Sequence, residues 1–247
     1  MAEAAALSTA GYIAAVVPNL SRAQTLFKRE LSLRKELGDE KGAANSLRGI
    51  SFTLMLRNEV SQAQPYIGQA LAISRAVQDT PGIAWSLFDL GYLALVRGEL
   101  SAAQALLAEA LPLLQEQGIN FGAFRALLAL GHVMRALGNH DPASRFYKDA
   151  LCLQQQMHYV QHIADGLEGL AAIAVADHDP MRAVRLFGAA HVHRQSIAIT
   201  RPYHQEVGYE CDVALTRNQL DAAAWEANWV AGCAMTLEPA VEYALAA

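Results

Sequence analysis

The sequence predicts an all-α fold, organised as a solenoid of five helical hairpins followed by a C-terminal helical cap. Alanine and leucine dominate, while aromatic residues make up only 7% of the chain. These two residues lose little on entering a helix. Apolar positions recur at three- and four-residue spacing, as on one face of a helix. The chain also aligns with itself at a shift of 40 residues, as the columns below show.

Composition excludes several classes of protein. A hydrophobic content of 53% over 247 residues is enough for a continuous core. A formal charge of −5 argues against a surface that neutralises phosphates, so we expect no direct nucleic-acid binding. Cys152, Cys211 and Cys233 form no Cys-x-x-Cys pair and are expected to be buried in a reducing cytoplasm.

The first residues are apolar, but they carry Glu3 and lack the basic n-region of a signal peptide. They also fit the repeat register, so we expect them to be folded. No stretch has the length and apolarity of a membrane helix, which predicts a soluble, cytoplasmic protein that does not contact a membrane.

The repeat consists of aligned small and large apolar residues. Its columns are Leu47, Leu87, Leu127 and Leu167; Ser51, Gly91, Gly131 and Ala171; Ala63, Ala103, Ala143 and Ala183; and Ile67, Leu107, Tyr147 and Phe187. The first 40 residues join with Leu7, Gly11, Ala23 and Phe27. A polar break splits each unit into two helices, so each unit is a predicted hairpin.

Starts of the second helices are marked by two kinds of signal. The pattern Ser-x-x-Gln begins at Ser21, Ser61 and Ser101, where the serine can cap the helix. Asp141-Pro142 and Asp179-Pro180 combine a capping residue with a proline suited to the first helical position.

Small residues at Gly91, Ala103 and Ala110, with Leu87 four places before the first and Leu107 between the last two, resemble the signature of the tetratricopeptide (TPR) family, in a form with a longer period. This resemblance implies a right-handed TPR-like superhelical solenoid. We expect hairpins at about 1–40, 41–80, 81–120, 121–160 and 161–200, and capping helices in 201–247.

The period is lost after the break at Arg201 to Glu206, which includes Pro202. Three more helices are predicted, the last with Thr236 as its N-cap: Tyr203 to Thr216, Leu220 to Met235 and Leu237 to Leu245. Because the final repeat of a solenoid exposes an apolar face, we expect these helices to cover it.

Three runs near the C-terminus resemble the end of large bacterial LuxR-type regulators and related signalling ATPases: Arg182 to Ala190, Ala222 to Trp225 and Met235 to Leu245. The resemblance implies the sensor or protein-interaction arm of a transcriptional or signalling regulator. The chain has no Gly-x-x-x-x-Gly-Lys-Ser/Thr loop and no recognisable basic helix-turn-helix, so ATPase and DNA-binding activities do not carry over. We expect an excised arm; the alternative is a stand-alone adaptor that self-associates through its edge or its C-terminal cap.

In TPR hairpins the first helix lines a concave groove, and the aligned columns predict which residues face it. The groove would bind a protein or peptide, or else a small molecule, through aromatic rings and directional arginine bonds. The candidates are Tyr12, Asn45, Arg48, Phe52, Trp85, Phe88, Tyr92, Arg125, His132, Arg135, Asp165 and Glu168.

Two alternatives stay open for these residues. The rings, Phe52 and Phe88 above all, could instead fill the space between successive first helices. Asp165 and Glu168 could form internal ion pairs with Arg125 and Arg135.

We expect no metal, no cofactor and no catalysis. His158 and His162 have ligand spacing, but they straddle a repeat junction, whereas His191 and His193 face different sides of a helix. Cys152 and Cys211 lie in apolar surroundings that disfavour a thiolate. A homodimer would favour the adaptor, whereas a strict monomer would favour the sensor arm.

Overall fold

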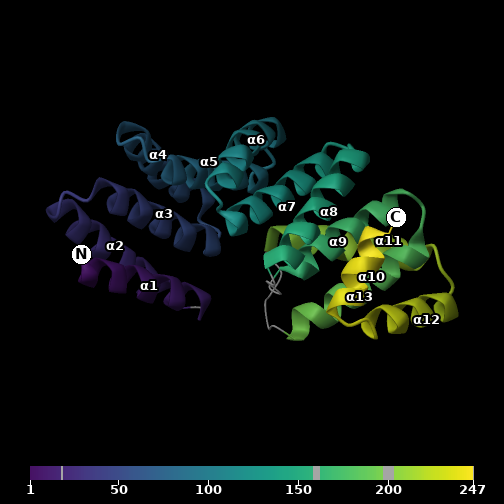
Figure 1. The fold of residues 1–247 in the computed structure, drawn as a ribbon. Helices are drawn as coiled ribbons and strands as arrows, with labels where there is room; N and C mark the ends of the chain where they lie inside the picture. Colours follow the sequence, from purple (N-terminus) through teal and green to yellow (C-terminus); the bar gives the residue numbers. More distant parts are fainter. Residues whose placement is uncertain (18, 158–161, 197–202, 247) are drawn as a thin grey trace. The chain divides into compact units, whose positions relative to one another are not determined.

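The computed structural model describes residues 1–17, 19–157, 162–196 and 203–246 (Figure 1). Helices occupy almost all of this part of the chain, and no strand occurs in it. The first ten helices form the five predicted hairpins: α1 (Ala2–Val16) with α2 (Leu20–Glu36), α3 (Glu40–Leu56) with α4 (Val60–Ala76), α5 (Thr80–Val96) with α6 (Leu100–Glu116), α7 (Asn120–Ala136) with α8 (His140–Met157), and α9 (Ile163–Ala176) with α10 (Pro180–Ser196).

Seven of the described hairpin helices, α2 to α7 and α9, end in a residue of left-handed conformation. After α5, Gly98 has a φ of +75°, its N–H donates to the Leu95 carbonyl, and the Glu99 N–H donates to the Ala94 carbonyl. This arrangement is a Schellman motif, which satisfies carbonyls that the helix leaves free. The same conformation recurs every twenty residues from Gly38 to Gly138, at Gly38, Asn58, Gln78, Gly98, Gly118 and Gly138, and again at His178, forty residues further on.

The predicted serine caps are wrong, because the helices begin before the serines. The left-handed residue Asn58 is followed at once by the N-cap Glu59, so α4 begins at Val60 and Ser61 lies inside it. Ser21 and Ser101 likewise lie inside α2 and α6, because the N-cap residues of these helices are Asn19 and Glu99. Asp141 lies within the first turn of α8, whereas Asp179 accepts a hydrogen bond from the Arg182 N–H and caps α10 as predicted.

The hairpin cores form where the aligned columns meet. Ala63, Ala103, Ala143 and Ala183 are all completely buried. A Cβ at Gly131 would come within 2.6 Å of the Tyr147 ring, so the small residue is what lets α7 and α8 approach each other. The residues of the aligned 40-residue columns therefore form the surface on which the two helices of each hairpin pack.

The contacts divide the chain into two compact units. Unit 1 contains residues 1–122 and unit 2 contains residues 123–247. The predicted boundary between hairpins and cap, near residue 200, lies inside unit 2 and remains a prediction.

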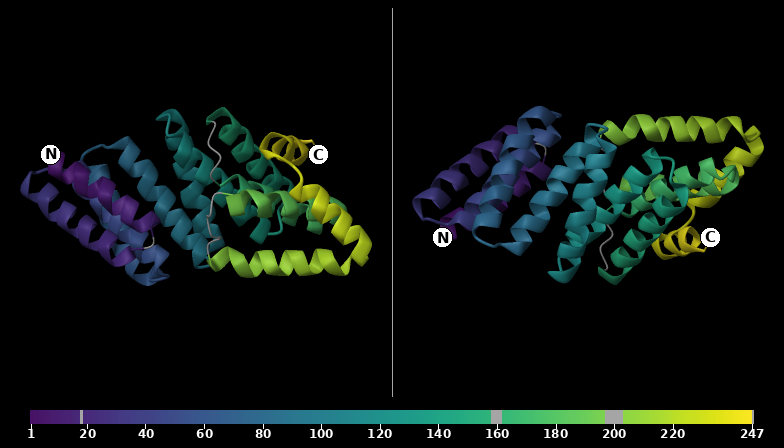
Figure 2. Two further views of the ribbon diagram at one scale, coloured as in Figure 1. Left: turned by 90° about the horizontal axis from the view of Figure 1, so that it is seen from below. Right: turned by 90° about the horizontal axis from the view of Figure 1, so that it is seen from above.

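Three helices complete unit 2: α11 (Tyr203–Asn218), α12 (Ala222–Cys233) and α13 (Leu237–Leu245). Thr236 is the N-cap residue of α13, as predicted, although its side chain makes no capping hydrogen bond. Two glycines allow α12 to pack on α10: a Cβ at Gly188 would lie 2.7 Å from the Trp229 carbonyl oxygen, and one at Gly232 would overlap the Arg185 carbonyl. The last hairpin is thus covered by C-terminal helices. Figure 2 shows α11 running along one side of unit 2 and α12 turning back from its end.

The cysteine prediction was wrong in most respects. Cys152 and Cys211 are exposed, and only Cys233 is partly covered, by α10. Both exposed cysteines occupy positions that helical periodicity places on the outer side of their helices.

Candidate functional site

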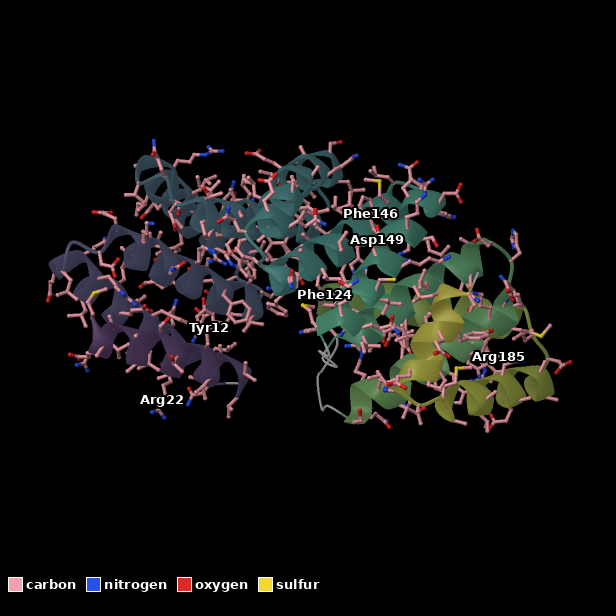
Figure 3. All side chains as sticks on the ribbon, in the orientation of Figure 1. Tyr12, Arg22, Phe124, Phe146, Asp149 and Arg185 are labelled. Atoms are coloured by element: carbon pink, nitrogen blue, oxygen red, sulfur yellow. The ribbon has the colours of Figure 1, made fainter. Side chains whose placement is uncertain are left out.

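In unit 1, the first helices of the three hairpins form a surface that we call the α1–α3–α5 face. Its α1 end carries Tyr12, which is 42% exposed and lies on the side of α1 nearer α3 (Figure 3). The Tyr12 ring lies 6.2 Å from the ring of Phe52 and 5.0 Å from the buried ring of Phe27. Phe52 is half-buried, so it both fills space between α1 and α3 and presents an edge outward.

The centre of this face is a charged and aromatic cluster between α3 and α5. Arg48 Nε donates to Asp89 Oδ2 at 2.6 Å, and the Arg48 guanidinium lies 5.0 Å from the centre of the Trp85 ring. Both charged side chains are largely buried. Their pairing fixes the guanidinium against the face of the indole, where a cation–π interaction is favourable. The main role of Arg48 is therefore to hold the Trp85 ring in place, and its charge is already paired with Asp89.

Asp89 was missing from the sequence-based candidates. The column analysis passed over it because its equivalents are Gly49, Ala129 and Gly169. The sequence did contain a signal that could have identified Asp89, because it is the only charged residue within α5.

The remaining unit 1 candidates differ in accessibility. Phe88 is 1% exposed, so its ring belongs to the core and cannot be reached from this face, in line with the space-filling alternative. Tyr92 stacks on Phe88 at 6.1 Å and is half-buried, and Asn45 is exposed. The surface that remains open to a partner is made by Tyr12, Asn45, Trp85 and Tyr92, with the edge of Phe52.

In unit 2, the equivalent surface of α7 and α9, the α7–α9 face, is contacted by α11. Arg135 Nη1 on α7 donates to Asp212 Oδ2 on α11 at 3.0 Å. Ala172 and Val175 on α9, which follow the candidates His132 and Arg135 by 40 residues, are 6% and 7% exposed, and α11 packs against α9. Burial raises the pKa of Asp212, although Arg135 opposes this effect. Arg135 is therefore engaged within the chain.

The other α7 candidates are half-buried. His132 Nδ1 lies 2.9 Å from the hydroxyl of Tyr147, whose ring is fully buried. Burial raises the pKa of Tyr147 far above its ordinary value, so the phenol stays protonated and can donate to His132. His132 thus supports the core of the fourth hairpin. Arg125 is half-buried on α7 and remains a predicted binding residue.

Asp165 and Glu168 form internal ion pairs, and Arg194 on α10 supplies the charge. Arg194 Nη2 lies 2.7 Å from Asp165 Oδ1 and 2.8 Å from Glu168 Oε2. His162 adds a contact of 3.1 Å to the other oxygen of Asp165. Burial alone would raise the pKa of Asp165, but the His162 hydrogen bond and the Arg194 charge outweigh it and lower this pKa to about 2. Arg194 was not among the predicted partners; it reaches both carboxylates from the second helix of the same hairpin.

The described part of the chain offers neither a metal site nor a membrane-spanning helix. No group of three or more His, Cys, Asp or Glu side chains is arranged there to hold a metal ion. His158, whose spacing from His162 was noted in the sequence, lies outside the described residues. None of the described helices combines the length and apolarity needed to cross a bilayer.

Comparison with solved structures identifies the architecture. TPR-like repeats of a kinesin light chain from Podospora anserina superpose with a TM-score of 0.57 at 13% identity, over 78% of this chain and 95% of that one. The fold is TPR-like. A Rap protein complexed with Competence and Sporulation Factor gives a TM-score of 0.67 at 15% identity, over 92% of this chain and 66% of that one. PilF of Pseudomonas aeruginosa gives 0.59 at 14% identity, over 91% and 96%.

Sequence comparison gives a narrower match. No family model matches the TPR-like chain. Proteins of Mycobacterium bovis and Mycobacterium tuberculosis, named as HTH-type transcriptional regulators, are 30% identical over 95 residues. The match covers 38% of this chain but only 11% of those relatives, so the chain corresponds to a small part of their length.

Proposed function

We propose that this TPR-like chain is a non-catalytic binding module that takes a protein or peptide partner on the α1–α3–α5 face of unit 1. One observation carries the proposal: this face presents Tyr12, Asn45, Trp85 and Tyr92 toward solvent on a rigid helical layer. Aromatic side chains supply large contact areas at small entropic cost and dominate many interfaces. Arg48, held by Asp89, fixes the Trp85 ring in advance of binding.

The biological setting we propose is the sensor or interaction arm of a bacterial transcriptional or signalling regulator in the cytoplasm. The local match to HTH-type transcriptional regulators supports this setting, as does the resemblance of the C-terminal runs. The Rap structure bound to Competence and Sporulation Factor is an example of the same fold in complex with a factor. LuxR-type character and the absence of direct nucleic-acid contact remain parts of this proposal.

Affinity capture with matched variants tests it. Wild-type protein and the variants Trp85→Ala and Tyr92→Ala would be used as baits in lysate of the cells that express it. We expect a partner retained by wild type to bind each variant about tenfold more weakly or worse, because losing an aromatic anchor commonly costs about 2 kcal/mol. Met181→Ala, which removes an exposed apolar side chain from unit 2, should bind as wild type does. Undiminished capture by folded Trp85→Ala and Tyr92→Ala proteins would refute the proposal.

Self-association is a second candidate, favoured by one exposed apolar patch. Ile13, Val16 and Val17 at the end of α1 are 59%, 79% and 64% exposed. Sedimentation velocity across a concentration series distinguishes the two functions. A concentration-dependent dimer abolished by Val16→Asp favours the adaptor, and a monomer throughout favours the partner-binding arm.

A further inference from the structure

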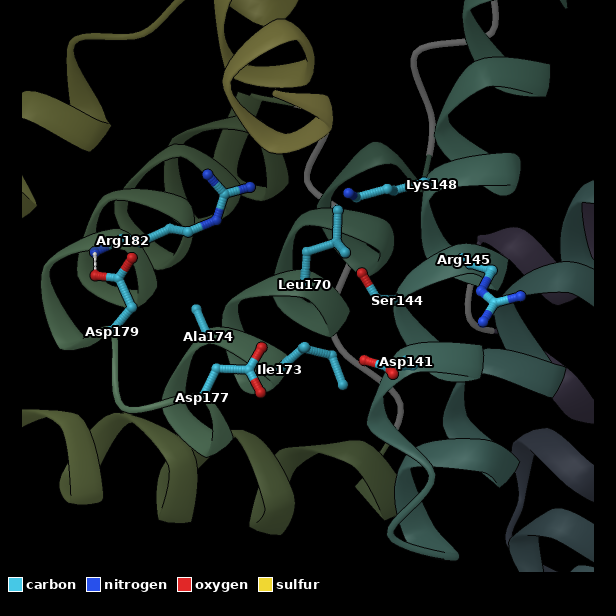
Figure 4. Close-up of a pocket in the computed structure, with 10 residues that line it drawn as sticks. All are labelled: Asp141, Ser144, Arg145, Lys148, Leu170, Ile173, Ala174, Asp177, Asp179 and Arg182. Atoms are coloured by element: carbon cyan, nitrogen blue, oxygen red, sulfur yellow. Dashed lines mark hydrogen bonds between the residues drawn. The ribbon is translucent and has the colours of Figure 1, made fainter. Parts of the chain in front are cut away.

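A groove in unit 2 is lined by none of the residues named for the two faces described above. It is bounded by α8, α9 and α10 and has a volume of about 430 Å³ (Figure 4). Leu170, Ile173 and Ala174 of α9 form its apolar floor. A cavity of this size is in the range of small-molecule sites and is too small for a protein interface.

Charges of opposite sign lie at the two ends of this groove. Lys148 and Arg182 lie near Leu170 at one end, and Asp141 and Asp177 lie near Ile173 at the other (Figure 4). Asp179 and Arg145, one charge of each sign, line the two flanks between these ends. Asp141 and Lys148 belong to the same helix, α8, with a separation of seven residues. At a rise of about 1.5 Å per residue, the two charged ends are about 10 Å apart.

The groove charges are available to a ligand. Within the described part of the chain, Lys148, Asp141 and Asp177 form no ion pair with any side chain. Arg182 is positioned by α13: its Nη2 donates to the Ala244 carbonyl oxygen at 2.9 Å, and its guanidinium lies 5.1 Å from the Tyr243 ring. Neither contact neutralises its charge, so the guanidinium is held in place and stays cationic.

From this arrangement we infer that the α8–α9–α10 groove binds a short zwitterionic peptide of about four residues with aliphatic side chains. Three residue steps of an extended peptide span about 10 Å, which matches the separation of the charged ends. The terminal ammonium lies between Asp141 and Asp177, and the terminal carboxylate lies between Lys148 and Arg182. The aliphatic side chains cover the floor made by α9. A phosphate-rich or purely acidic ligand does not fit, because half of the groove is negative.

Isothermal titration calorimetry with the tetrapeptide Ala-Leu-Leu-Ala tests the inference directly. The free-terminated peptide should bind, and its N-acetylated, C-amidated form should bind about fivefold more weakly or worse, because each exposed ion pair contributes up to about 1 kcal/mol. Equal binding of the two forms, or no binding of either, overturns the proposal. The proposal is also overturned if a capped Lys-Leu-Leu-Asp peptide binds and the free tetrapeptide does not. In that case the groove recognises charged side chains and not the charged termini of a peptide.

Charge-swap variants locate the site. Lys148→Glu and Asp177→Lys should each weaken binding of the free tetrapeptide by about fivefold or more. The double variant Lys148→Glu/Asp177→Lys exchanges the two charges, so that each end of the groove again carries one charge opposite to the other. It should therefore recover part of the affinity for the free tetrapeptide. Thermal melts confirm folding of each variant. Tyr92→Ala, on unit 1, should bind the tetrapeptide as wild type does, which separates this groove from the function proposed for the α1–α3–α5 face. Single swaps that leave the affinity unchanged place the peptide elsewhere.

Discussion

Arg135 on α7 and Asp212 on α11 join the C-terminal segment to the α7–α9 face through a hydrogen bond of 3.0 Å. The two side chains are 33% and 17% exposed, so solvent partly screens their charges. The coupling free energy between them should therefore be about 1 kcal/mol at most. A double-mutant cycle with Arg135→Ala and Asp212→Ala, measured by urea unfolding, gives this value. Additive effects of the two substitutions would show that α11 is held by its apolar contacts alone.

This pair also marks the limit of what periodicity predicts. The 40-residue columns correctly predicted the hairpins, because the Tyr147 ring packs against Gly131 of its own unit and Gly169 of the next unit. The partner of Arg135 is Asp212, 77 residues further along the chain, where the repeat has already ended. Nothing in the repeat register indicates where α11 will lie, so the predicted groove extended over a surface that α11 contacts.

Candidate residues within unit 1 were predicted with mixed success for a related reason. The column rule identifies the side of a helix but not the depth of each side chain. Phe88 and Arg48 occupy the same column, yet Phe88 is 1% exposed in the core, while the Arg48 side chain keeps 12% exposure and pairs with Asp89. The serine caps failed because the left-handed turn residues, such as Asn58, set the helix start earlier than the Ser-x-x-Gln pattern indicated.

Packing of α12 on α10 should depend on glycine at one position. Gly232→Ala would place a methyl group against the Arg185 carbonyl, and overpacking of this kind commonly costs about 1 to 3 kcal/mol. The same substitution at Gly68, where a Cβ meets nothing within 4 Å, should instead stabilise α4 by up to about 1 kcal/mol. Chemical unfolding of both variants measures the contrast. Equal effects would mean that α12 can shift away from α10 at little cost.

Asp165 should give the protein an acid-sensitive contribution to stability. Its folded pKa of about 2 lies below the ordinary pKa of an aspartate, 3.8, so the stabilisation is present above pH 4 and is lost as the pH falls toward 2. A shift of this size corresponds to about 2 kcal/mol. Asp165→Asn should therefore lower the free energy of unfolding at pH 7, and the difference from wild type should shrink in acid. A difference that is constant from pH 7 to pH 2.5 would contradict the proposed role of the Arg194 and His162 contacts.

Thiol reactivity should separate the three cysteines. Cys152 and Cys211 are exposed and should react quickly with a maleimide at pH 7.5. Cys233 should react more slowly, because burial raises its pKa and its Sγ lies 3.5 Å from the Gly188 carbonyl oxygen. Mass spectrometry of labelled peptides over time follows each site, and labelling in urea provides the reference in which all three react alike. Rapid labelling of Cys233 in the folded protein would show that α12 separates readily from α10.

Hydrogen–deuterium exchange of the chain with and without a captured partner tests the central claim most directly, because it maps the contact surface without any substitution. If the α1–α3–α5 face binds the partner, added protection should concentrate in peptides that contain Tyr12, in 45–52 of α3 and in 85–92 of α5. Peptides from α7 and α9 should exchange as they do in the free protein. Protection confined to unit 2, with exchange in α3 and α5 unchanged, would contradict the account.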